Sequence, residues 1–227
     1  MTTIFLIRHG LTAQTGRILY GQTRGIPLDH RGRAQAEQLA DRFATVKLTA
    51  IYSSPLERCT DTVEPLGRRQ RRPVVVREDL IEMDAGSWTG RTLTSLRRLK
   101  RWGEVQRSPS TFRFPNGESF EEALARTTAA VGAIARKHPR GRVAVATHGD
   151  IARILMAHYG GAPLDAFQRT VIDTASVSVV LLDRGDARVL LVNDTGGLDR
   201  FGPNGSPPPW EIQEATGSAG GGASRRT

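Results

Sequence analysis

The sequence predicts an α/β protein, a three-layer α/β/α sandwich with a mainly parallel central sheet. Four short apolar runs, at residues 4–7, 50–52, 74–76 and 143–146, alternate with longer segments of helical periodicity. Apolar runs without alternation are typical of strands covered on both faces, and alternation of strands with helices is typical of parallel sheets. A chain of 227 residues can bury the large core that such a sheet needs.

The spacing of apolar residues predicts helices over residues 31–43, about 56–66 and about 120–138, with a further helix after Gly149. Pro55 stands where a helix begins, a position that proline favours. Ser119 and Glu122 form an S-x-x-E capping box in front of the third helix.

The C-terminal part of the chain predicts a hairpin and then a tail. Residues 177–182 and 189–192 are rich in strand-forming residues and flank a short turn. After about Arg200 the composition changes to Gly, Pro, Ser and Thr, which offers too little apolar surface to offset the entropy of ordering. We therefore expect one domain over residues 1–200 and a disordered tail over residues 201–227, in which Trp210 is the one residue suited to docking.

The charge of the chain raises the question of an anionic partner. The net charge is +9 and the pI is about 10.8, which would attract polyanions. The basic residues gather in separate clusters at 68–72, 97–101 and 225–226, so a solvated basic surface is favoured over a nucleic-acid-binding stripe. A single cysteine, no secretory leader and no apolar stretch of ~20 residues predict a cytoplasmic protein without a membrane partner, either a monomer or a homodimer.

Charged and polar residues follow the predicted strands at their carboxyl ends. Arg8 and His9 end the first strand, His148 and Gly149 end the fourth, and Arg58 lies in the first turn of the helix after the second. Ligands of open parallel sheets bind at this edge, and arginine forks with helix N-termini are suited to phosphoryl groups. The pattern predicts an anion site bounded by two arginines and two histidines.

Four motifs together resemble the histidine phosphatase, or phosphoglycerate mutase-like, superfamily. They are R-H-G at residues 8–10, S-P-L-E-R at 54–58, E-M-D-A-G-S-W-T-G at 82–90 and H-G at 148–149. The likeness extends over about residues 1–195 in the same order and spacing. It implies a phosphomonoesterase acting on a small-molecule phosphate ester.

The resemblance also implies a role for each matching residue. His9 would attack phosphorus through one ring nitrogen while a backbone carbonyl holds the other. Arg8, Arg58 and His148 would bind the phosphoryl oxygens, and Glu82 would protonate the leaving alcohol and later accept a proton from water.

Gly149, Thr15 and Gln22 are expected to complete the phosphate site. Thr15 stands where many relatives have an asparagine that contacts phosphate, and Leu11 replaces a common acid, so this sequence departs from the family at the rim of the site. The remaining histidines show no ligand spacing with Cys, Asp or Glu. We expect neither a metal nor a cofactor.

Several alternatives stay open at this stage. Arg58 could pair with Glu57 or Asp61 on its own helix, and Asp84 competes with Glu82 for the acid role. Cys59 lacks the C-x5-R spacing of cysteine phosphatases. This absence favours an unreactive, buried thiol at Cys59.

The same pocket could also serve a cofactor-dependent phosphoglycerate mutase. Mutases of this family carry an added basic segment, whereas the span from Gly90 to Asn116 is short here, with Gly103 and Glu104 after Trp102. This comparison favours the phosphatase over the mutase. A nucleic-acid-binding protein with an idle pocket is the less favoured third hypothesis.

Overall fold

The computed structural model describes residues 1–183 and 186–196. The expected domain boundary at residue 200 and the tail over 201–227 lie outside the described residues. The strands are β1 (Thr2–Arg8), β2 (Ala50–Ser53), β3 (Val74–Val76), β4 (Arg142–Thr147), β5 (Val177–Asp183) and β6 (Asp186–Asp194). The helices are α1 (His30–Arg42), α2 (Glu57–Gln70), α3 (Leu93–Leu96), α4 (Trp102–Arg107), α5 (Phe120–Lys137) and α6 (Gly149–Tyr159), with 3-10 turns η1 (Glu78–Leu80), η2 (Gly86–Trp88), η3 (Pro109–Thr111) and η4 (Leu164–Arg169).

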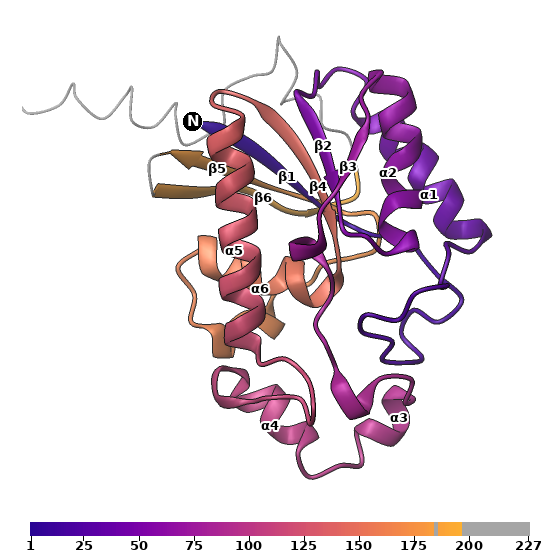
Figure 1. Cartoon of the computed structure of the whole chain (residues 1–227), viewed down its shortest axis with the longest axis vertical. Helices are drawn as coiled ribbons and strands as arrows, with labels where there is room; N and C mark the ends of the chain where they lie inside the picture. The colour runs from indigo at the N-terminus through magenta and orange to yellow at the C-terminus, as the bar shows by residue number, and fades with distance from the viewer. Residues whose placement is uncertain (184–185, 197–227) are drawn as a thin grey trace, which may run out of the picture.

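The strands form one sheet in the order β3-β2-β4-β1-β5-β6. The pairs β2 with β3, β2 with β4 and β1 with β4 are parallel, while β5 runs antiparallel to both β1 and β6. In Figure 1, α1 and α2 cover one face of the sheet, and α5 and α6 cover the other. The predicted α/β/α sandwich with a mainly parallel sheet is confirmed.

Each face of the sheet has its own apolar core, because successive side chains of a strand point to opposite faces. Ile4 and Leu6 of β1 belong to the core beneath α5 and α6. Phe5 and Ile7 of the same strand belong to the core beneath α1 and α2. Burial on both faces explains why the strand runs in the sequence are continuously apolar.

Two regions differ from what the spacing predicts. Helix α2 continues to Gln70, past the predicted end near Leu66, with Pro65 inside it. The segment between residues 90 and 114, which has no clear periodicity, forms the short helices α3 and α4 and the turn η3 at one end of the molecule (Figure 1). The capping box of Ser119 and Glu122 is formed at the start of α5 as predicted.

In the described part of the chain, no helix has the length and apolar character that crossing a membrane requires.

Candidate active site

The parallel pairing of β1 with β4 brings the two histidines together. Arg8 lies opposite Thr147 in the register, so the residues that follow, His9 and His148, leave the sheet at the same edge. Their ring centroids are 5.4 Å apart, and both side chains are buried. The two imidazoles therefore face a common region.

His9 is held in a defined tautomer. Its Nδ1 lies 2.8 Å from the main-chain oxygen of Gly10, and because a carbonyl only accepts, Nδ1 must carry the proton. Burial, with the nearby charges of Arg58 and Arg8, lowers the pKa of His9 to about 3. The ring is thus neutral at physiological pH, with the lone pair on Nε2.

His148 is the N-cap residue of α6 and contacts the loop that follows β2. Its Nε2 is 2.7 Å from Oγ of Ser54, and Sγ of Cys59 is 3.5 Å from the same nitrogen. Burial and the charge of Arg58 hold the pKa of His148 well below its usual value. A neutral imidazole fixed in this way can serve as a hydrogen-bond donor to an anion.

Arg58 enters from the first turn of α2 and is fully buried. Its guanidinium donates to the main-chain oxygens of Gly21 and Thr23, at 2.7 and 3.1 Å, and lies 4.6 Å from the centre of the Tyr20 ring. Within the described residues no ion pair joins it to Glu57 or Asp61. The guanidinium instead points toward the loop after β1, where its charge acts on both histidines.

Arg8 is anchored by one hydrogen bond, from Nη1 to the main-chain oxygen of Ile172 at 2.6 Å, and its Nε is buried without a partner. Burial and the charge of Arg153 lower the pKa of Arg8. A Cβ on Gly149 would lie 3.1 Å from this Nε. Glycine at the first position of α6 therefore leaves room for the Arg8 side chain.

Glu82 is the carboxyl group that faces these residues. Its Oε1 accepts from the amide of Met83 at 3.0 Å. Burial and the nearby charge of Asp150 raise the pKa of Glu82 to about 7. Asp84, the rival acid, accepts from the amide of Gly86 at 2.9 Å and does not line the cavity.

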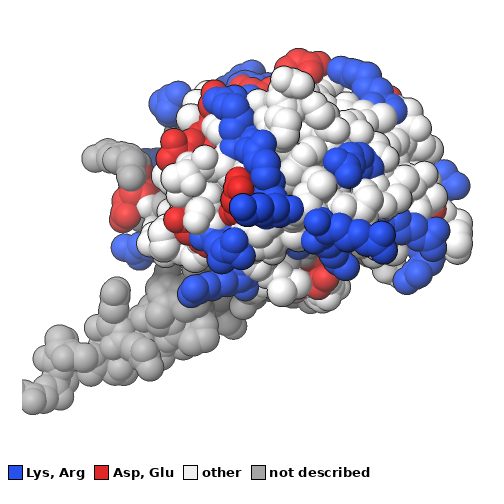
Figure 2. Space-filling model, turned by 90° about the horizontal axis from the view of Figure 1, so that it is seen from below, with Lys and Arg blue, Asp and Glu red and all other residues white. Residues whose placement is uncertain are grey.

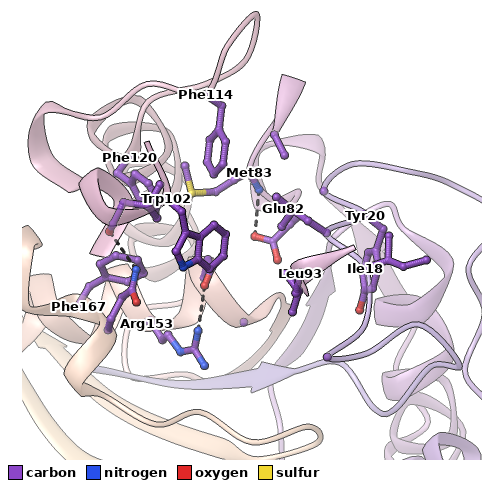
Figure 3. Close-up of a pocket in the computed structure, with 18 of the residues that line it drawn as sticks. Ile18, Tyr20, Glu82, Met83, Leu93, Trp102, Phe114, Phe120, Arg153 and Phe167 are labelled. Atoms are coloured by element: carbon purple, nitrogen blue, oxygen red, sulfur yellow. Dashed lines mark hydrogen bonds and ion pairs between the residues drawn. The ribbon is translucent and has the colours of Figure 1, made fainter. Parts of the chain in front are cut away.

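A cavity of about 430 Å³ lies at this edge of the sheet (Figure 3). Arg8, His9, Glu82 and Gly149 line it together with apolar side chains from the loop after β1, from the α3 to α5 region and from η4. Arg58 and His148 are not among the lining residues. Both are fully buried, His148 with its ring centroid 5.4 Å from that of His9 and Arg58 close enough for its charge to act on His9.

The structure does not place Thr15 or Gln22 on the wall of this cavity. The Oγ1 atom of Thr15 accepts from the amide of Thr12 at 3.0 Å, which closes a local turn. The side-chain amide of Gln22 donates to the main-chain oxygen of Glu82 at 2.9 Å and so supports the strip of chain that carries the acid. Their phosphate contacts stay a prediction.

Two lining residues, Asp150 and Arg153, were not anticipated from the sequence. They are an i, i+3 pair in the first turns of α6, with Arg153 Nη1 3.0 Å from Asp150 Oδ1. The sequence feature that could have revealed them is their position in the first turns of the helix that follows His148 and Gly149. The aromatic residues of the 88–120 region were also missed, because nothing in their spacing distinguishes a cavity wall from a core.

Comparison with known proteins decides the family. A family model described as the histidine phosphatase superfamily, branch 1, matches residues 4–195. The chain belongs to this superfamily. The resemblance carried by the four motifs is thereby confirmed.

Other histidine phosphatases show how wide the likeness is. Phosphoserine phosphatase 1 of Hydrogenobacter thermophilus is 27% identical over 88% of this chain and 96% of its own length. Probable phosphoglycerate mutase GpmB of Proteus mirabilis is 30% identical over 79% of this chain and 85% of that protein. Some further relatives are longer, and the chain spans 55% of their length.

Among solved structures, YhfR of Bacillus stearothermophilus matches with a TM-score of 0.80 and 30% identity over 86% of this chain and 98% of that one. These relatives indicate a phosphatase enzyme of the superfamily. They leave the substrate and the chemical steps to be argued from the residues.

The end of the molecule that carries α3 and α4 is basic. Figure 2 views the molecule from this end, and Lys and Arg side chains predominate on the face. Among the exposed residues here are Arg97, which lines the cavity, and Arg98, Lys100 and Arg107. A positive potential at the entrance would draw anionic esters toward the site.

The described residues contain no group of three or more His, Cys, Asp or Glu side chains arranged to hold a metal ion. Cys59 is buried, and burial raises the pKa of its thiol far above the ordinary value. A thiol in that state is a poor nucleophile.

Proposed function

We propose that this protein hydrolyses small phosphorylated metabolites through a phosphohistidine intermediate on His9, with Glu82 as general acid and base and without a metal. The observation that carries the proposal is the state of His9. Its Nδ1 proton is held by a carbonyl and its ring is kept neutral beside two guanidiniums, so Nε2 is a free nucleophile where an anionic phosphoryl group would bind.

In the first step, the lone pair of His9 Nε2 forms a bond to phosphorus as the bond from phosphorus to the ester oxygen breaks. The electrons of that bond go to the leaving oxygen, which takes a proton from the carboxylic acid of Glu82. Arg8 and Arg58, with a hydrogen bond from His148, stabilise the charge on the transferring group. The raised pKa of Glu82 keeps a large share of it protonated for this task.

In the second step, water attacks the phosphohistidine. Glu82, now a carboxylate, accepts a proton from that water, and the bond from Nε2 to phosphorus breaks to return neutral His9. Inorganic phosphate leaves and the acid is again protonated. The same carboxyl group thus acts as a general acid in the first step and as a general base in the second.

Hydrolysis is favoured over phosphoryl transfer to a second bound hydroxyl. The segment between residues 90 and 116 forms the four-residue helix α3 and the six-residue helix α4. Five basic residues could reach a second anionic group: Arg97, Arg98, Lys100, Arg101 and Arg113. Arg101 and Arg113 are bound to Glu104 and Glu122, and the other three are exposed to solvent. A mutase remains the alternative, in line with the relative named as one.

The decisive test replaces His9 with Ala and uses His158→Ala as the matched control, since His158 is exposed at the end of α6. We expect His9→Ala to abolish turnover of ethyl phosphate and of a nitrophenyl ester with unchanged circular dichroism. The phosphorylated enzyme, trapped by rapid denaturation at high pH, should carry the phosphoryl group on His9 by mass spectrometry. Turnover that persists in the variant would exclude His9 as nucleophile.

Three further measurements separate the alternatives. A chelator should leave the rate unchanged, whereas a loss restored by a divalent metal would refute the metal-free mechanism. With 3-phosphoglycerate and a bisphosphoglycerate primer, release of inorganic phosphate should exceed isomerisation. Steeply salt-dependent binding of DNA or RNA that survives His9→Ala would instead favour the nucleic-acid hypothesis.

A further inference from the structure

The wall of the cavity changes in character with distance from His9. The side chains of Trp102, Phe114, Phe120 and Phe167 all border the same cavity as Arg8, His9 and Glu82. Figure 3 shows these rings on one side of the pocket, with Glu82 and Tyr20 on the other. A pocket with a few polar groups at one end and apolar walls elsewhere is the usual form of a site for a small organic molecule.

The rings support one another as a fixed wall. Phe120 packs against Phe167 at 5.0 Å and against Phe114 at 5.7 Å between ring centroids. Trp102 stacks on the buried Trp88 at 6.1 Å with an interplanar angle of 25°. Trp102 itself is only partly buried, so it is the member of the wall with surface left to offer to a ligand.

Besides Arg8, the basic residues that line the cavity are Arg97 and Arg153. Arg153 pairs with the carboxylate of Asp150 across 3.0 Å, and Arg97 is exposed to solvent. An additional carboxylate on the substrate gains little from a guanidinium that is already paired or solvated, whereas an uncharged ring gains from contact with the aromatic wall. A cavity of about 430 Å³ also exceeds what a three-carbon leaving group would fill.

Building on the proposed function, we propose that the preferred substrates are phosphomonoesters of alcohols that carry a planar aromatic or heteroaromatic ring, with the ring packed against Trp102, behind which the buried rings form a fixed support. The phosphoryl group then lies at Arg8 and His9, and the ester oxygen lies near Glu82. Phosphoserine and phosphoglycerate, which have no ring and carry a carboxylate, become the poorer substrates.

Binding is tested separately from turnover by phosphonates, whose carbon–phosphorus bond the enzyme does not hydrolyse. By calorimetry, 2-(1-naphthyl)ethylphosphonate should bind about 10- to 100-fold more tightly than ethylphosphonate, because burial of a bicyclic ring is favourable. Trp102→Leu should reduce this preference about tenfold and leave the affinity for ethylphosphonate unchanged. Trp102→Phe is a second, more conservative variant that should act in the same direction if the first folds poorly.

Phe43→Leu is the matched control, since Phe43 is a fully buried ring that packs on Phe5 in the core on the opposite face of the sheet. It should lower stability without changing the preference. Equal affinity of the wild type for both phosphonates, or a preference that survives both cavity variants, would overturn the inference.

Turnover of the corresponding esters distinguishes this inference from the proposed function. The naphthylethyl and ethyl esters have similar leaving alcohols, so a ratio of kcat/KM above about 10 reports ring recognition rather than bond strength. Hydrolysis of ethyl phosphate and phosphoserine without a preference for the ring would refute the inference and leave the phosphatase intact. Tight phosphonate binding without hydrolysis of any ester would support the ring site and refute the proposed function.

Discussion

The pKa of Glu82 gives a prediction that can be worked in numbers. With a pKa of about 7, roughly half of the Glu82 side chains are protonated at pH 7, whereas the ordinary value of 4.5 would leave only about 0.3%. The environment therefore raises the concentration of the acid form by about 150-fold at this pH. Burial contributes most to this, and the charge of Asp150 contributes next.

If Glu82 is the general acid, kcat/KM for an alkyl phosphate should fall about tenfold for each pH unit above 7. A nitrophenyl phosphate has a leaving group that needs no proton. The two esters ionise at different pH values, so the ratio of their kcat/KM values isolates the titration of the acid between pH 7 and pH 9, where both esters are mainly dianions. We expect the ratio to decline from pH 7 to pH 9 in the wild type.

Glu82→Gln should lower kcat/KM for the alkyl ester by about 10²- to 10⁴-fold and flatten the decline of the ratio, with a smaller loss for the nitrophenyl ester. Asp84→Asn is the matched control, because this neighbouring carboxyl group lies outside the cavity. Equal losses on both esters, or a wild-type ratio that does not change with pH, would refute the acid role of Glu82.

Three further predictions follow from the same contacts. Gly149→Ala should reduce kcat/KM about tenfold in a steady-state assay with little change in Tm, since its Cβ would lie 3.1 Å from Nε of Arg8; an unchanged rate would show that this arginine need not keep its position. Ser54→Ala removes the 2.7 Å partner of His148 and should lower kcat by about 3- to 30-fold, and full activity would mean that this hydrogen bond does not orient the ring. Glu82→Gln should also change the pH dependence of stability. The Glu82 carboxyl ionises above about pH 4.5 in the unfolded chain but stays protonated to about pH 7 in the folded one, so wild-type stability falls as the pH rises through this window. By calorimetry, the Tm of the variant relative to the wild type should therefore rise from pH 5 to pH 8, and a fall would contradict the raised pKa.

The inner end of the site was predictable from the sequence because it depends on strand ends. An apolar run that stops at Arg8 and His9, and another that stops at His148, must deliver these residues to the same edge once the two strands pair in parallel. Arg58 was predictable for the same reason, as part of the first turn after β2. Short-range pattern and topology determine this part of the site.

The outer end of the cavity was not predictable in this way. The segment that contains Trp102 is held by stacking on Trp88, which lies outside any regular periodicity. The side chains of Thr15 and Gln22 are directed by a local turn and by a contact with the chain near Glu82, neither of which leaves a spacing signal. Helix α2 extends beyond its apolar pattern, and past Pro65 it is joined to α1 by ion pairs of Arg68 with Glu37 and of Arg69 with Asp41.

The buried guanidinium of Arg58 has a consequence for engineering this protein. Its partners are two main-chain oxygens and an aromatic ring, and no carboxylate of the described residues forms an ion pair with this buried charge. Replacing Arg58 with an apolar residue of similar size would remove the desolvation cost of this buried charge and so stabilise the folded state. Selection for heat resistance alone would therefore tend to discard a group that the proposed mechanism uses, and libraries built for thermostability need an activity screen at every round.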